Sequence, residues 1–391
     1  MEVRVVMQGE HVSIDRDVFF LLFDNSVAHA RAPYQHALDR GEISYADLTT
    51  LAHAARIPVA LFFAPKSVVE AQVDLKTRKL LAGLTKKSFS LNVRDAVPLR
   101  DIELILEDLI RKQELLKRHD STLARNRVVG ALAKRGDSAE ADAATLSEML
   151  GITHETIRAA PKKDAAVDRL IRRLEANQVL VSQSQNTFMP QRLHGVHFSG
   201  MTVKDSKVPY IFLPSGDEGE SVSPAGRRTF TLMLLTVLVA RGIFAPVNYS
   251  STATPTTGTH EYDVTAEILM PKKEFKLART RNRADFEALA DEYKVTPSAA
   301  IVRALRLDKI DESSAGLLLA ELRSEFRKLP KQPRNPSKPV NGVRRYNGRE
   351  LSSRMLRALD EGKISQGDFF REVCLNNIVP AELDEFRRSL R

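Results

Sequence analysis

The sequence predicts an α+β protein that is mostly helical and carries a small antiparallel sheet. Apolar residues recur at helical spacing along most of the chain, and short β-like runs (VLVSQ, LHGVHF, VPYIFLP) cluster between Val179 and Leu213. The 391 residues, 43% of them hydrophobic, suffice for packed cores in about two to three domains. This composition excludes a wholly disordered chain.

Several classes of protein are excluded by single features. One cysteine, Cys374, cannot form an intrachain disulfide or a cysteine-based zinc cage, and we interpret it as a buried structural thiol. The N-terminus shows no signal-peptide pattern, and the longest apolar run, Phe230 to Ala240, is shorter than the ~20 residues of a membrane span. We therefore expect a cytoplasmic protein without membrane contact. The net charge of +9 suits a nucleic acid or an acidic protein without specifying either.

The first 124 residues are predicted as two parts, a small helical domain over 1–80 and a helical connector over 81–124. Gly41 precedes a helix that Ser44 and Asp47 open in a capping-box-like spacing. That helix runs into VALFFAP, which we expect to be an extended Phe-Phe strand. In the connector, DIELILEDLIRKQELLKR has one apolar face with i,i+4 charge pairs and predicts a helix.

A winged-helix-like unit is predicted over 125–190. Between Ala143 and Val181 the pattern is a helix, a turn, a second helix, an amphipathic helix and a β-run. In this interpretation Arg158 would face a major groove, and Arg172 and Arg173 would lie near phosphates. The alternative is a structural helical hairpin, whose apolar residues only pack the turn.

The last part of the chain predicts a linker followed by a helical hairpin. Residues 327–349 hold eight basic residues, no acidic residue and four interspersed prolines, so we expect either a solvated tether or a phosphate-tracking segment. The candidate contacts in it are Lys331, Arg334, Lys338, Arg344 and Arg345. Residues 350–361 and 365–376 are expected to form the hairpin within 350–391. Upstream, Thr296 and Pro297 are predicted to open a helix at its N-cap and N1 positions.

The nine histidines raise the question of a metal site. His194 and His197 form an H-x-x-H in a strand-like segment, where side chains three apart point to opposite faces. No H-E-x-x-H occurs in the sequence.

The segment VPYIFLPSGDEGESVSPAGRRTFTLM resembles the approach to the active-site helix of the ImmA/IrrE family of metallopeptidases. In that family an R-x-F-T-L-M type run is followed by H-E-x-x-H, whose histidines bind zinc while the glutamate is the general base. Residues 41–80 resemble the end of the family's Xre-like helix-turn-helix and its FF-P strand. Four later segments resemble further motifs of the family and occur in the family's order. They are residues 165–181, VTAEILMP, KVTPSAAIVRALRLDKID and residues 346–379. The resemblance implies a zincin-like helical core within 125–326.

The chain departs from the family at the catalytic positions. Where the family has H-E-x-x-H, this sequence has Leu234, Leu235 and Leu238, so both zinc ligands and the base are missing. The third ligand of the family would fall near 258–261, where His260 lies. The residues before GEISYADL also lack the family's Q-x-x-L-A-x-x-L-G-V recognition pattern. We expect no metal and no cofactor at this site.

The resemblance implies a non-catalytic regulator of a phage or mobile-element circuit. Its expected partner is an Xre-type repressor, a toxin or antitoxin, or DNA, and a homodimer is left open. One alternative is a sequence-specific DNA-binding regulator that uses residues 143–173 and the basic linker. Another is an active metallopeptidase with a relocated metal site at His194, His197 and His260.

Overall fold

The computed structural model confirms an α+β protein that is mostly helical. The structure describes residues 2–24, 26–29, 31–82, 84, 89–91, 97, 99–185, 187–191, 193, 198–214, 224–249, 259–328 and 337–390. The chain divides into two compact units, one of residues 1–83 and 97–108, the other of residues 84–96 and 109–391. Within the described part, no helix is both long enough and apolar enough to cross a membrane.

The smaller unit begins with a β-hairpin that the sequence interpretation missed. Strands β1 (Glu2–Met7) and β2 (Glu10–Asp15) pair antiparallel, and β3 (Glu42–Ser44) adds to β1 in parallel. The hairpin turn consists of Gln8 and Gly9, both at positive φ (50° and 90°). Two residues at positive φ give the backbone twist that a two-residue hairpin loop requires.

Four helices and two 3-10 turns lie wholly within the described part of the smaller unit. They are α1 (Arg16–Asp24), α2 (Ala32–Arg40), α3 (Tyr45–Ala54), η1 (Val59–Phe63), α4 (Lys66–Ala82) and η2 (Leu99–Asp101). The expected Phe-Phe strand is wrong, because Pro58 starts a 3-10 turn in which the Leu61 amide donates to the Pro58 carbonyl. This turn buries Phe62 against Phe23, with ring centroids 4.7 Å apart, and leaves Phe63 exposed.

The larger unit contains a five-stranded sheet in the order β4-β8-β6-β7-β5. Its strands are β4 (Phe89–Leu91), β5 (Leu180–Gln183), β6 (Gly200–Val203), β7 (Tyr210–Leu213) and β8 (Pro246–Tyr249). The sheet is mixed where an antiparallel one was expected: β6 pairs antiparallel with β7 and β8, but β7 pairs with β5, and β8 with β4, in parallel. Strand β7 lies between β6 and β5 in the sheet, and β5 and β6 run in opposite directions. Because β7 is antiparallel to β6, it is parallel to β5. Residues 194–197 of the predicted run LHGVHF lie outside the described residues.

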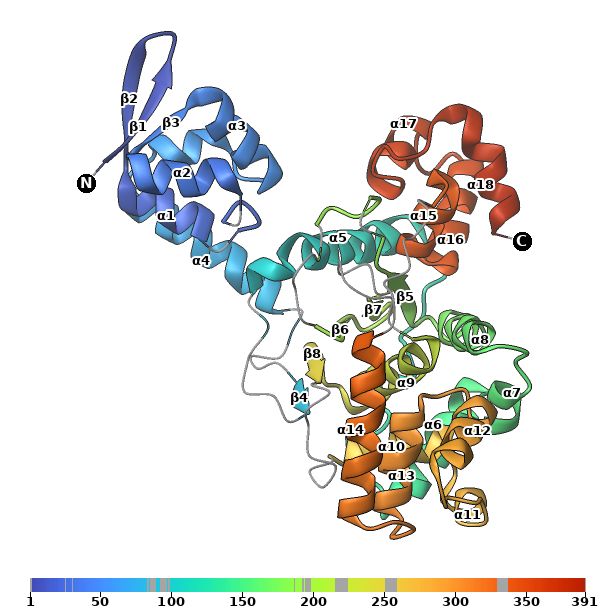
Figure 1. Ribbon diagram of the computed structural model, residues 1–391. Helices are drawn as coiled ribbons and strands as arrows, with labels where there is room; N and C mark the ends of the chain where they lie inside the picture. The colour runs from blue at the N-terminus through green and yellow to red at the C-terminus, as the bar shows by residue number, and fades with distance from the viewer. Residues whose placement is uncertain are drawn as a thin grey trace. The chain divides into compact units, whose positions relative to one another are not determined.

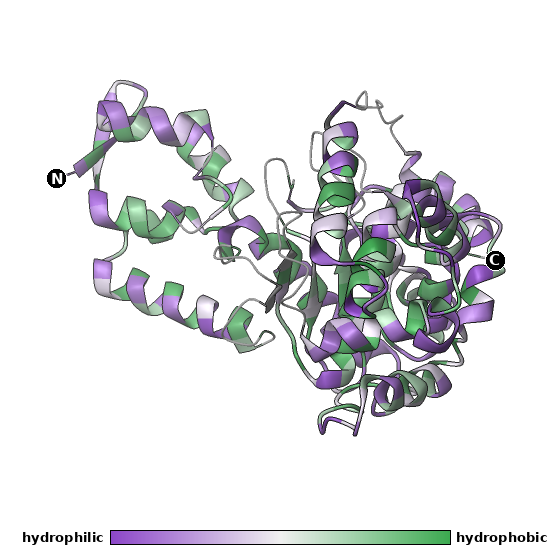
Figure 2. Ribbon diagram, turned by 60° about the horizontal axis from the view of Figure 1, so that its bottom comes forward, coloured by the Kyte–Doolittle hydropathy of each residue, from purple (hydrophilic) through white to green (hydrophobic). Residues whose placement is uncertain are grey.

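Helices surround this sheet (Figure 1). They are α5 (Glu103–His119), α6 (Ala139–Leu150), α7 (His154–Arg158), α8 (Lys163–Ala176), α9 (Ala225–Arg241), α10 (His260–Leu269), α11 (Lys272–Phe275), α12 (Arg283–Glu292), α13 (Pro297–Arg306) and α14 (Glu312–Lys328). Helix α9 packs against α8, α10, β6 and β7. Figure 2 shows hydrophobic segments gathered toward the middle of this unit.

The C-terminal part corrects two expectations. Residues 339–347 of the predicted linker form helix α15 (Pro339–Asn347), because Val340, Val343 and Tyr346 recur at helical spacing and are buried. After α16 (Arg349–Asp360), the expected second hairpin helix is a short α17 (Gln366–Asp368) followed by a π-helical turn, η3 (Phe369–Val373). The turn η4 (Pro380–Glu382) and helix α18 (Leu383–Ser389) end the described chain.

Candidate functional site

Helix α9 carries the three leucines at positions 234, 235 and 238. Leu234, Leu235 and Leu238 each have 0% exposure, and every residue from 229 to 240 is buried. Leu235 packs directly on strand β6, where a Cβ at Gly200 would lie 2.7 Å from its Cδ1. The helix face that would hold metal ligands is thus filled with close-packed hydrocarbon.

The residues near the expected third ligand are tied to other helices. His260 Nε2 lies 2.6 Å from Asp142 Oδ2, and Asp142 Oδ1 accepts from the Gly136 amide at 2.9 Å, so this pair joins α10 to α6. The neighbouring Glu261, 5% exposed, accepts from Arg241 Nε at 3.2 Å. His194 and His197 lie outside the described residues. Both polar groups at the start of α10 therefore have structural partners.

One set of described side chains has donor atoms of the kind that bind metals. His154 Nε2 lies 2.8 Å from Glu155 Oε1 and 2.6 Å from Glu274 Oε1. These are hydrogen-bond lengths, whereas ligands around a tetrahedral zinc ion are separated by roughly 3.3 Å, given Zn–N and Zn–O bonds near 2 Å. The other Glu274 oxygen binds Arg158. The set could hold a divalent cation only after its donor atoms move apart.

The helix-turn-helix-like segment is present, but its three arginines are used differently. Helix α7 has five residues, and Thr153 and Thr156 form a capping box at its start. Arg158 turns toward α11 and α12, where it pairs with Glu274 and Glu292 and stacks 4.2 Å from the Tyr293 ring centroid. Arg172 and Arg173 are exposed on α8. Arg158 is therefore engaged in ion pairs with α11 and α12, whereas the other two arginines are exposed.

The candidate contact residues of the predicted linker differ in exposure, and two of them are not described. Lys331 and Arg334 lie outside the described residues. Lys338 is exposed, with its Nζ 4.0 Å from Glu385 Oε1, and Arg345 is exposed on α15. Arg344 is half-buried and donates to the Ser389 carbonyl at 2.7 Å. Burial, with Arg349 and Arg345 nearby, lowers the pKa of the Arg344 guanidinium.

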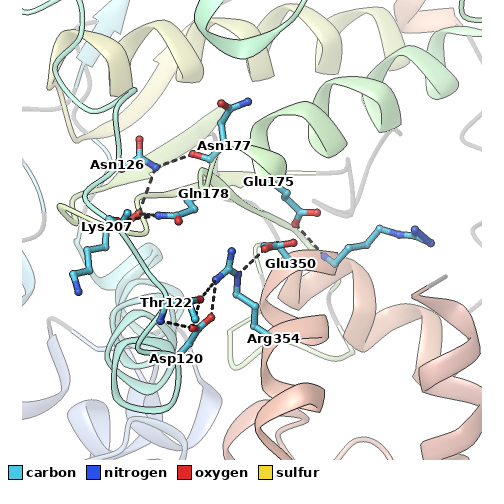
Figure 3. Close-up of polar contacts among 11 residues, drawn as sticks. Asp120, Thr122, Asn126, Glu175, Asn177, Gln178, Lys207, Glu350 and Arg354 are labelled. Atoms are coloured by element: carbon cyan, nitrogen blue, oxygen red, sulfur yellow. Dashed lines mark hydrogen bonds and ion pairs between the residues drawn. The ribbon is translucent and has the colours of Figure 1, made fainter.

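A buried carboxyl group, that of Glu175, joins the C-terminal helices to α8 (Figure 3). Glu175 Oε1 accepts from the Arg349 amide at 3.0 Å, at the first turn of α16, and a Cβ at Gly348 would collide with it. Burial is the main cause that raises the pKa of Glu175 to about 8. Beside it, Arg354 binds Glu350 and Asp120, each at 2.6 Å. This polar joint, made of Glu175, Arg354, Glu350 and Asp120, links α16 to α8 and to the end of α5.

A second group of polar residues connects three chain segments and was missed by the sequence interpretation. The Asn126 side chain donates to the carbonyls of Asn177 (2.9 Å) and Lys207 (3.4 Å), and Gln178 donates to Lys207 (3.2 Å) and Ala124 (3.0 Å). Figure 3 shows these amides converging. Of the cations that the three segments carry, we call Arg125, Arg127, Arg173 and Lys207 the basic cluster; Lys204 is a further exposed cation in the third segment. The available signal was the R-N-R alternation at 125–127.

Comparison with known proteins gives no significant match to a family model, a curated protein or a solved structure.

Proposed function

We propose that this protein is a non-catalytic regulator built on a peptidase-like scaffold of the ImmA/IrrE type, and that it acts by binding a partner. The observation that carries the proposal is the complete burial of Leu234, Leu235 and Leu238 in the centre of the larger unit. The scaffold assignment itself rests on the sequence motifs quoted above.

The chemistry supports a loss of hydrolysis. A metallopeptidase needs protein ligands with lone pairs, an open coordination position for water and a base beside it. Leucine supplies none of these, and close packing around α9 leaves no open face at positions 234 and 238. A scaffold that no longer catalyses hydrolysis can keep its recognition surfaces, because function resides in sites rather than in the fold.

The partners of this proposal follow from the resemblance. An Xre-type repressor, or a toxin or antitoxin from the same phage or mobile element, is the proposed protein partner, bound in the cytoplasm. A second copy of the chain, in a homodimer, is a further partner that this proposal allows. DNA binding is the second candidate function, and the exposure of Arg172 and Arg173 on α8 favours it.

The test combines metal analysis with a cleavage assay. The protein, purified without chelators, is analysed for zinc by mass spectrometry and incubated with the repressor encoded by a neighbouring gene. We expect no stoichiometric zinc, an intact repressor on gels, and a stable complex in size-exclusion chromatography. One zinc per chain together with repressor cleavage would overturn the proposal.

Two variants identify the residues responsible if zinc is found. His154→Ala removes the ligand set with Glu155 and Glu274, and His260→Ala removes the imidazole paired with Asp142. Zinc and cleavage lost together in one variant would establish a relocated metallopeptidase site there. Zinc lost without any effect on the repressor complex would leave the binding function in place.

A further inference from the structure

We propose that the basic cluster of Arg125, Arg127, Arg173 and Lys207 binds the phosphodiester backbone of a nucleic acid duplex, without reading its sequence. The inference deepens the second candidate function, DNA binding, and rests on it: it names the surface and the backbone chemistry of that binding, neither of which depends on helix α9. It also differs from a helix-turn-helix interaction, since it does not use α7.

The cluster is held in place by backbone contacts from three segments. The Asn126 amide donates to the Ser206 carbonyl at 2.8 Å, while the Asn126 side chain reaches Asn177 and Lys207 as described above. The Lys207 amide donates to Asp205 Oδ1 at 2.7 Å, which fixes the turn that carries Lys207. Asn126 is 5% exposed, and its neighbours Arg125 and Arg127 are exposed on either side of it. Rigid attachment lowers the entropy that ligand binding would otherwise cost.

Two carbonyl groups at the end of α8 accept hydrogen bonds from asparagine side chains. The Asn177 side chain donates to the Arg173 carbonyl at 2.8 Å, and Asn126 donates to the Asn177 carbonyl. Terminal carbonyls are common partners for lysine and arginine side chains at a helix end. Here asparagine side chains take this role, and the Arg173 side chain is exposed, so its guanidinium can bind an anion.

The cluster differs in its charge balance from other basic groups in the same unit. Among the described residues, none of its four members forms an ion pair, whereas Arg158 and Arg354 each bind two carboxylates. The acidic residues in the same segments turn inward: Asp205 binds Lys117 at 2.7 Å, and Glu175 faces α16. The surface therefore presents cations without a compensating anion.

The surroundings favour a phosphate backbone over an acidic protein. Segments 121–127, 173–178 and 204–207 contain no aromatic residue, although aromatic anchors dominate the energetics of protein interfaces. Duplex binding by phosphate contacts needs only cations at suitable places, and it draws on counterion release. The cluster offers no free helix or hairpin that could enter a groove, so base readout is not part of the inference.

The test is fluorescence anisotropy with a labelled random-sequence duplex, as DNA and as RNA, at several salt concentrations. The full-length protein is compared with R125A/R127A/R173A/K207A. We expect the variant to bind the duplex at least ten-fold more weakly, with a salt slope shallower by roughly 3 to 4, since each phosphate contact contributes about −0.9. The duplex that binds more tightly shows whether the basic cluster prefers the backbone of DNA or that of RNA.

A matched control separates the contribution of the basic cluster from that of the protein's net charge. The variant K273A/K276A/R279A/R281A removes the same charge from exposed positions in and after α11. Equal weakening in both variants, or unchanged binding in the cluster variant, would overturn the proposal. Loss of binding to poly-glutamate without loss of duplex binding would also overturn it, in favour of an acidic protein. Thermal melts establish that both variants fold, and zinc content and repressor binding serve as independent readouts of the proposed function.

Discussion

Helices α8 and α9 pack against each other in the larger unit, yet they are built on opposite principles. Helix α9 is buried all round from 229 to 240, and the hydroxyl of Thr236 is satisfied within the helix by the Leu232 carbonyl at 2.7 Å. Helix α8 buries one face, and at its C-terminal end it forms polar links to other segments through Glu175, which accepts from the Arg349 amide, and through the Asn177 carbonyl, which accepts from Asn126.

The two helices therefore contribute in different ways: burial around α9 stabilises the unit as a whole, and polar contacts at the end of α8 connect particular segments. Apolar burial around α9 is non-directional and contributes in proportion to the area removed from water. The links at the end of α8 depend on individual donors and acceptors, and they determine which segments lie next to one another. We therefore expect substitutions in α9 to lower global stability, and substitutions at the end of α8 to loosen particular neighbours.

The largest effect is expected for Leu238→Ala in α9. Leu238 is fully buried, so the change loses its transfer free energy and leaves a cavity, at a cost of about 2–5 kcal/mol. Urea unfolding followed by circular dichroism measures the loss. Leu317→Ala on α14, where the leucine is 72% exposed, is the control and should change stability little. A similar loss in both variants would contradict the distinction drawn for α9.

A smaller effect is expected for Arg354→Ala in the polar joint. Its side chain is 16% exposed and binds Asp120 and Glu350, so removal leaves two carboxylates without their partner and should cost about 2 kcal/mol. The same unfolding assay, with hydrogen exchange of α16, measures it. Arg387→Ala breaks the more exposed pair with Asp360 and should cost less. Uniform exchange changes throughout the unit would argue against a local connection.

Glu175→Gln should change the pH dependence of stability. The pKa of Glu175 is raised to about 8 in the folded protein, from an ordinary value of 4.5. The protonated carboxyl is therefore favoured by folding, and its contribution is complete below pH 4.5 and is lost as the pH rises to about 8. The free energy of unfolding of the wild type should fall across this window relative to the variant. Parallel pH profiles of the two proteins, or a profile changed equally by Glu148→Gln on α6, would exclude this role.

The smallest effect is expected at the cap of α8. Asn177→Ala loses the hydrogen bond to the Arg173 carbonyl and should cost about 1 kcal/mol. Asn177→Asp keeps the shape but places an anion at a helix C-terminus, where the dipole disfavours it, so it should cost more. Thermal melts of the two variants test the order. The reverse order would show that the donor does not satisfy the helix end.

Local patterns predicted the elements that depend on neighbours in sequence. Thr296 before α13 and Pro297 at its first position mark its start, and Thr296 Oγ1 accepts from the Ala299 amide at 3.2 Å. The apolar run at 230–240 lies within α9, and Ser44 caps α3. Such features are decided by a few adjacent side chains, so their signal is present in the sequence alone.

Features that depend on distant partners could not be predicted in the same way. Arg158 matches a recognition-helix pattern, but Glu274, more than a hundred residues later, binds it. Helix α15 looks like linker by composition, and its burial depends on close contact with Phe188, which a side chain at Gly342 would prevent. The basic cluster is assembled from three separate segments. In each case the deciding contact is tertiary and outweighs the local pattern.

The parallel pairing of β4 with β8 has a consequence for biosynthesis. Phe89 pairs with Val247, and the strand β6 that lies beside β8 comes between them in the chain. At translation rates of about 5–20 residues per second, β4 leaves the ribosome on the order of ten seconds before its partner exists. Sheets with such non-local pairing fold slowly. The larger unit should thus complete its sheet only late in synthesis, whereas the hairpin of the smaller unit can form as soon as it emerges.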